Sequence, residues 1–102
     1  MDEENNSIYI FTVYFSSGKT LSAKFNGKKK NEILNSFKKG WNETTSIFFT
    51  VDSNGFVSLN GSAVGETITG NTGGALSPTA GEEFGINFSL VTHYELKLTY
   101  KG

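Results

Sequence analysis

Polar and apolar residues alternate without interruption from Thr92 to Tyr100, near the end of the chain. Every second residue is an aromatic or a leucine: Tyr94, Leu96, Leu98 and Tyr100. The residues between them are polar: His93, Glu95, Lys97 and Thr99. Successive side chains of a strand point to opposite faces of a sheet, so this pattern predicts a strand with one inward and one solvated face. Such strands are typical of antiparallel sheets, which therefore must form a large part of the fold.

Several other segments also have the character of strands. Residues 8–15 are apolar or aromatic on both faces apart from Thr12, which is typical of a strand covered on both sides or placed in mid-sheet. Residues 20–25 alternate and follow the turn sequence Ser-Ser-Gly-Lys, which predicts a hairpin. Residues 47–51 and 56–59 flank Asp-Ser-Asn-Gly, a strong hairpin turn, and residues 84–88 resume a strand.

One segment has the spacing of a helix. Residues 28–39 carry Ile33, Leu34 and Phe37 at helical intervals, and Asn26 before them is a plausible N-cap. Two lysines followed by Gly40 predict the end of the helix, because cations and a glycine are favoured there. We expect the three apolar residues to meet the inner faces of the first and last strands.

These elements predict the fold class and the domain organisation. A chain of 102 residues fits one domain. We expect an α+β domain over 1–102, with an antiparallel sheet of five to six strands and one helix packed on one face. Residues 1–7 are polar and read as a flexible tail. Seven of the twelve glycines fall within 61–85, and residues 70–82 are predicted to form a long glycine-rich loop.

The residue types present argue against an enzyme. The chain has no cysteine and a single histidine, His93, which the alternation places on the polar face of the last strand. A zinc site needs three or four ligands, so no metal site and no catalytic residue is predicted. The glycine-rich loop contains no lysine and lacks the Walker spacing for phosphate. We therefore expect no cofactor.

Composition also bears on location. No apolar run is long enough to span a bilayer, so no membrane partner is expected. The acidic and polar start is unlike a secretory signal, and the absence of cysteine fits a reducing compartment. The expectation is a cytoplasmic protein, or one in the host cytoplasm if it is encoded by a phage.

A cluster of lysines is the strongest candidate for a binding surface. All nine cationic residues are lysine, and five of them fall within twelve positions. The candidate binding residues are these five and the tryptophan that follows them: Lys28, Lys29, Lys30, Lys38, Lys39 and Trp41. Cations near the start of a helix oppose its dipole at a cost of about 0.3–1 kcal/mol each. A solvated basic face that maintains solubility is the alternative interpretation.

Residues 36–42, Ser-Phe-Lys-Lys-Gly-Trp-Asn, resemble the helix end of small phage-encoded anti-CRISPR proteins. The resemblance implies an inhibitor of a host protein such as a CRISPR effector. This chain has a net charge of −1 and lacks the strongly acidic surface with which such an inhibitor mimics DNA, so no DNA-mimic residue is carried over.

The predicted function is that of a non-catalytic module that binds a protein, plausibly as a phage or mobile-element inhibitor. The first alternative is a phage structural or assembly component that self-associates. Its candidate contacts between subunits are the aromatic residues Tyr9, Phe11, Phe48 and Phe49, which would make the protein a homo-oligomer. The second alternative, contact with a nucleic-acid backbone through the lysine-rich helix, is disfavoured by the absence of arginine.

Overall fold

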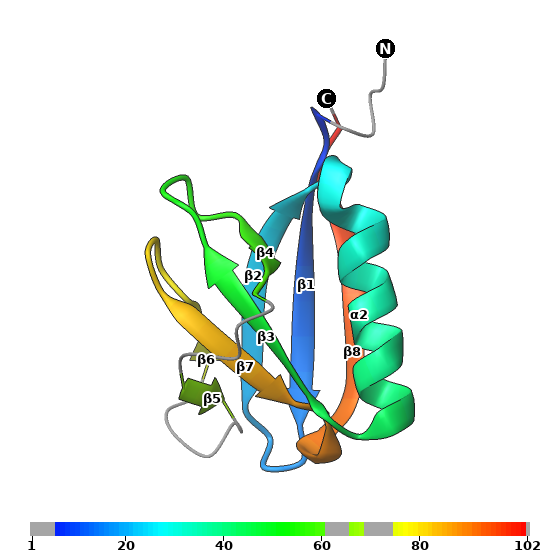
Figure 1. Ribbon diagram of the computed structural model, residues 1–102. Coiled ribbons are helices and arrows are strands. Elements are labelled where there is room, and N and C mark those ends of the chain that lie inside the picture. The colour runs from blue at the N-terminus through cyan, green and yellow to red at the C-terminus, as the bar shows by residue number, and fades with distance from the viewer. Residues whose placement is uncertain (1–5, 61–65, 69–74, 102) are drawn as a thin grey trace.

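The computed structural model describes residues 6–60, 66–68 and 75–101, whose strands form two sheets (Figure 1). The first sheet has the order β6-β2-β1-β8, with β1 at Ile8–Phe15, β2 at Thr20–Asn26, β6 at Ala75–Leu76 and β8 at Val91–Tyr100. The second has the order β4-β3-β7-β5, with β3 at Ser46–Val51, β4 at Val57–Leu59, β5 at Glu66–Ile68 and β7 at Glu83–Asn87. Three antiparallel strands form the main part of each sheet, and β6 or β5 adds to one edge in parallel.

The α+β class is confirmed, whereas the single sheet of five to six strands was wrong. Strand β1 has β2 on one side and β8 on the other, so both of its edges are occupied. Strands β3 and β7 pair with each other and not with this sheet, and they form a second layer. The two layers meet at a bridge between Lys24 of β2 and Phe56, where the Lys24 ammonium lies 4.8 Å from the ring centroid of Phe56. Strand patterns identified the strands but not the sheet to which each belongs.

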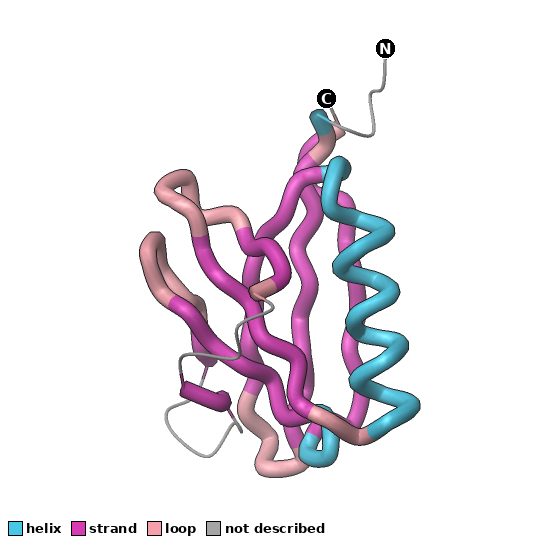
Figure 2. The backbone as a smooth tube through the Cα atoms, viewed as in Figure 1, coloured by secondary structure: helices cyan, strands magenta, loops and turns pink. Residues whose placement is uncertain are grey.

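Helix α2 at Lys30–Glu43 lies beside the two sheets and runs along β8 (Figure 2). A short 3₁₀ helix, η1 at Gly27–Lys29, comes before it, and the Asn26 side chain accepts a hydrogen bond from the Lys28 amide at 3.1 Å. Asn26 therefore caps η1 and not α2. The helix was expected to end before Gly40, but it continues for four more residues to Glu43, and Thr44 provides the left-handed cap with φ of 50°.

Gly40 serves packing rather than helix termination. A Cβ atom at this position would lie 2.4 Å from Cδ2 of Phe88, in the second 3₁₀ helix, η2 at Phe88–Leu90. A glycine after two lysines is consistent with the end of a helix and also with a close packing contact inside the helix. The sequence alone does not distinguish the two. The close approach of Phe88 explains why glycine occupies this turn.

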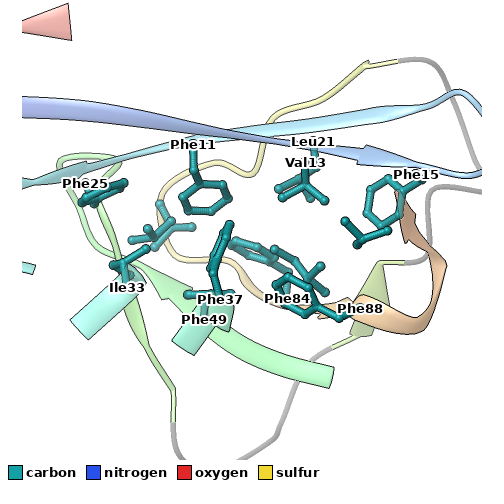
Figure 3. Close-up of a cluster of buried hydrophobic side chains, with 14 residues drawn as sticks. Phe11, Val13, Phe15, Leu21, Phe25, Ile33, Phe37, Phe49, Phe84 and Phe88 are labelled. Atoms are coloured by element: carbon teal, nitrogen blue, oxygen red, sulfur yellow. The ribbon is translucent and has the colours of Figure 1, made fainter. Parts of the chain in front are cut away.

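Phenylalanine dominates the buried core, and Phe37 of α2 lies near its centre (Figure 3). The Phe37 ring centroid is 4.8 Å from that of Phe11 on β1 and 4.9 Å from that of Tyr94 on β8. It is also 6.0 Å from Phe49 on β3. Contact between the helix and the first and last strands is thus confirmed for Phe37, and the same side chain reaches the second sheet.

The aromatic residues proposed as contacts between subunits have different environments. Phe11 and Phe49 are fully buried within one chain, so they cannot lie between two copies. Tyr9 is half-buried and stacks on Phe25, with centroids 5.5 Å apart. Phe48 is half-buried against the backbone of Gly85, where a Cβ would lie 2.5 Å from its ring. The intramolecular core therefore accounts for most of this aromatic content.

The predicted tail and loop lie partly outside the described residues. Within the tail, residues 1–5 are not described, but Ser7 is 2% exposed and its carbonyl accepts a hydrogen bond from the Gly27 amide. Within the loop, residues 70–74 are not described, and Ala75–Leu76 pair with β2. Thr79 and Glu82 close a hydrogen-bonded turn that also bonds to Val51.

Candidate functional site

Four of the candidate lysines are free of ion pairs in the part of the chain that the structure describes. Lys28 and Lys29 belong to η1, and Lys38 and Lys39 belong to the third turn of α2. Lys28, Lys38 and Lys39 are exposed and Lys29 is half-buried. Lys28 and Lys38 are ten positions apart. At 1.5 Å per residue, about 15 Å of helix axis therefore lies between the two lysines of η1 and the two of α2.

Lys30 has a different environment from the other candidates. Its ammonium lies 5.2 Å from the ring centroid of Tyr9, within the range of a cation–π interaction. Tyr9 itself stacks on Phe25, so Lys30 covers one end of the core. A contribution to the fold follows from this contact, independently of any partner.

The lysines of the third turn lie on two flanks of α2. Lys38 is four residues after Leu34 and three before Trp41, so these three side chains share a flank. Lys39 instead lines a groove of about 540 Å³ between α2 and the second sheet. The other lining residues are Glu32, Asn35, Ser36, Ser46, Ile47, Phe48, Leu59 and Asn60. The structure thus places Lys38 with Leu34 and Trp41 on one flank of α2, Lys39 at the groove, and Lys28 and Lys29 in η1 ahead of the helix.

Trp41 lies in the last turn of α2, over the start of β8. Its ring packs edge-on against Tyr94, with centroids 5.9 Å apart, and 43% of the residue stays exposed. Further along β8, Leu98 is 46% exposed and Tyr100 is 59% exposed. The sequence pattern placed both of the latter side chains inward. Leu98 does share the inner side with Tyr9, its register partner, but this end of the strand is not covered.

Polar side chains on the outer face of the first sheet form hydrogen bonds with one another. The Tyr14 hydroxyl donates to Glu95 Oε1 at 3.0 Å, and this bond raises the pKa of Tyr14. His93 stacks on Tyr14, with ring centroids 4.1 Å apart. The Thr12 and Ser22 hydroxyls lie 3.1 Å apart. His93 is exposed here, as expected; besides this stacking, its Nδ1 lies 3.1 Å from the Thr92 hydroxyl.

Two further observations limit the chemistry of the described residues. Their His, Asp and Glu side chains form no group of three that could hold a metal ion. None of the helices in the described ranges has the length and apolar character needed to cross a lipid bilayer.

Comparison with known proteins gives no match: no protein-family model, no curated protein and no solved structure is significantly similar to this chain. Geometry and chemistry of the surface must therefore carry the functional argument.

Proposed function

We propose that this protein is a non-catalytic module that binds an acidic surface of another protein through η1 and the open side of α2. The observation that supports the proposal is that Lys28, Lys29 and Lys38 form no ion pair within the residues that the structure describes. Trp41, on the same flank of α2 as Lys38, supplies exposed aromatic area beside that lysine. Tryptophan is enriched among the residues that dominate protein interfaces.

The position of the first two lysines makes an anionic partner favourable. A helix N-terminus carries a partial positive charge, so each cation there costs about 0.3–1 kcal/mol at an exposed site. Glu32 is the only acidic residue in the first turn of α2. A carboxylate supplied by a partner would interact favourably with both the lysines and the helix dipole, and salt would weaken the interaction.

A protein partner is favoured over a nucleic acid by the aromatic residues near the lysines. Binding of single strands depends on aromatic faces on which bases stack. The Tyr9 ring stacks on Phe25 and lies beneath Lys30, and Trp41 packs against Tyr94. The cations are all lysine, which lacks the planar fork used to read guanine and phosphate.

The test is affinity capture from an extract of the host cell with two variants of equal charge. Lys28→Glu combined with Lys38→Glu should abolish capture of the partner. Lys19→Glu combined with Lys97→Glu changes the net charge by the same amount, in the turn after β1 and on β8, and should retain capture. Lys30 is left intact in both variants because of its contact with Tyr9.

Nuclease treatment of the extract separates the two kinds of partner. Capture that persists after the treatment supports a protein partner. Loss of capture would show that the surface binds nucleic acid. Equal capture by both charge variants would refute the proposed surface. Inhibition is the proposed consequence of binding, and the anti-CRISPR resemblance makes a purified CRISPR effector the first enzyme to assay for loss of DNA cleavage.

A further inference from the structure

Strand β8 presents a long edge to solvent. It is ten residues long and pairs with β1 on one side, and none of the other described strands lies along its second side. Most of its residues are exposed, including Glu95, Lys97 and Leu98. Unpaired edges bind further strands readily unless charges or irregularities prevent it.

The register shows which backbone groups face that edge. The Phe15 amide donates to the Lys19 carbonyl at 2.9 Å, so Phe15 directs its backbone groups toward β2. The pairing of β1 with β2 is unbroken from there, and alternation directs Thr12 toward β8 and its register partner Glu95. Leu96 therefore directs its N–H and C=O outward. Tyr94 and Leu98, two residues away on either side, do the same.

The charges on β8 are complementary to a second copy in one register. When Leu96 lies on a two-fold axis, Glu95 stands opposite Lys97 of the second copy, and Lys97 stands opposite its Glu95. An axis at Glu95 or at Lys97 would place two like charges opposite each other, which is destabilising. A lysine in an edge strand normally prevents pairing with another strand. Here Glu95 of the second copy would stand opposite Lys97 in this one register and compensate its charge.

The apolar residues are complementary in the same register. Leu98, which is 46% exposed, would stand opposite Tyr94 of the second copy, over which Trp41 lies 43% exposed. The helix covers the start of β8 and leaves its end open, and a two-fold axis brings the covered half of one copy beside the open half of the other (Figure 1). The exposed part of Leu98 in each copy would thus be buried against Tyr94 and Trp41 of the other copy.

We propose that two copies of this chain associate through the edges of β8, antiparallel and with Leu96 on the two-fold axis. The backbones of Leu96 exchange two hydrogen bonds, and those of Tyr94 and Leu98 continue the ladder. The register irregularity at Ile8 and Tyr9 lies opposite the end of β8 and limits the ladder on that side. β8 carries none of the lysines of the proposed function, whereas Trp41 borders both surfaces, so self-association is tested below with substitutions in β8 alone.

Analytical ultracentrifugation of the full chain over a micromolar concentration series tests the proposal with five samples. The wild type should show a monomer–dimer equilibrium. Glu95→Lys and Lys97→Glu each place like charges opposite each other twice, so each should weaken self-association about tenfold. A mixture of these two variants restores opposite charges at both positions and should form a heterodimer. The double variant with both substitutions should dimerise as the wild type does.

Three results would overturn the proposal: a wild type that stays monomeric throughout, single variants that dimerise normally, or a mixture that fails to associate. Circular dichroism checks that the variants fold, because Glu95 also accepts the Tyr14 hydrogen bond. If they do not, hydrogen exchange of the wild type decides. The Leu96 amide must become more protected as the concentration rises, and exchange that is independent of concentration refutes the interface.

Discussion

Phe88 lies against the backbone of Gly40 in the middle of a helix turn, and this contact leads to a prediction against the usual helix preference. Alanine is favoured over glycine in a helix by about 1 kcal/mol. At position 40, however, the added Cβ would lie 2.4 Å from the Phe88 ring. Overpacking costs about 1–3 kcal/mol, so we expect Gly40→Ala to lower the free energy of unfolding in urea denaturation.

Two further variants locate the origin of that effect. Asn42→Ala changes an exposed position of the same helix and should leave stability unchanged or slightly higher. Combining Gly40→Ala with Phe88→Leu removes the ring that the Cβ meets, so the cost of the alanine should shrink in that background. An equally large cost with leucine at position 88 would show that Phe88 is not the cause.

Glu82 provides a prediction of pH dependence. Its pKa is lowered because the backbone amide and the hydroxyl of Thr79 donate hydrogen bonds to its carboxylate. The stabilisation of this turn is therefore present above the ordinary pKa of glutamate and is lost as the pH falls through the lowered value. Thr79→Ala removes the hydroxyl alone, so NMR titration should show the Glu82 pKa rising part of the way to its ordinary value. An unchanged pKa would exclude the hydroxyl as a cause.

The residue that ends helix α2 allows a test of whether its left-handed conformation is strained. Thr44 adopts φ of 50° and ψ of 42°, a left-handed conformation that costs a residue with a side chain about 1 kcal/mol or more. Thr44→Gly should therefore stabilise the protein by up to about 1 kcal/mol in urea denaturation. Thr44→Ala is the matched control, because it also removes the hydroxyl that bonds to the Glu43 carbonyl but keeps the Cβ. Equal stability of the two variants would contradict a strained cap.

Elements with strong local patterns could be predicted from the sequence. β1 has the expected bounds, and both hairpin turns occur where they were expected, each with a glycine at positive φ. The three-residue β5 and two-residue β6 could not be predicted, because their pairing depends on β7 and β2 and not on a pattern of their own. The helix was displaced by a few residues at each end, since η1 takes the cap and Gly40 is a packing residue.

The candidate site was predictable only in part. The pattern identified the lysines and Trp41, but not that Lys39 would line a groove or that Lys30 would lie over Tyr9. These positions depend on where η1 ends and on the second sheet, which local patterns do not reveal. Exposure of Leu98 was missed for a related reason: alternation indicates the face of a side chain, whereas its burial depends on how far α2 reaches along β8.

At the scale of the whole molecule, one side chain of helix α2 contacts both sheets. Phe37 packs on β1, β3 and β8, so its loss should affect both sheets at once. Phe37→Ala should lower the free energy of unfolding by about 3–5 kcal/mol, with Trp41 fluorescence and far-UV circular dichroism following one transition. Leu34→Ala, at a half-buried position of the same helix, should cost less. Separate transitions for the two probes would show that the sheets unfold independently.

The central place of β1 also determines when the protein can fold during its synthesis. Its partners are β2, made immediately after it, and β8, made after all the other described strands, so Ile8 pairs with Tyr100. A ribosome that has reached residue 90 therefore carries a chain with one side of β1 unpaired and without the Tyr94 ring that packs on Phe37. Non-local pairing of this kind slows folding. The first sheet is completed only once β8 has left the exit tunnel, and until then the Phe37 ring lacks the contact that Tyr94 supplies.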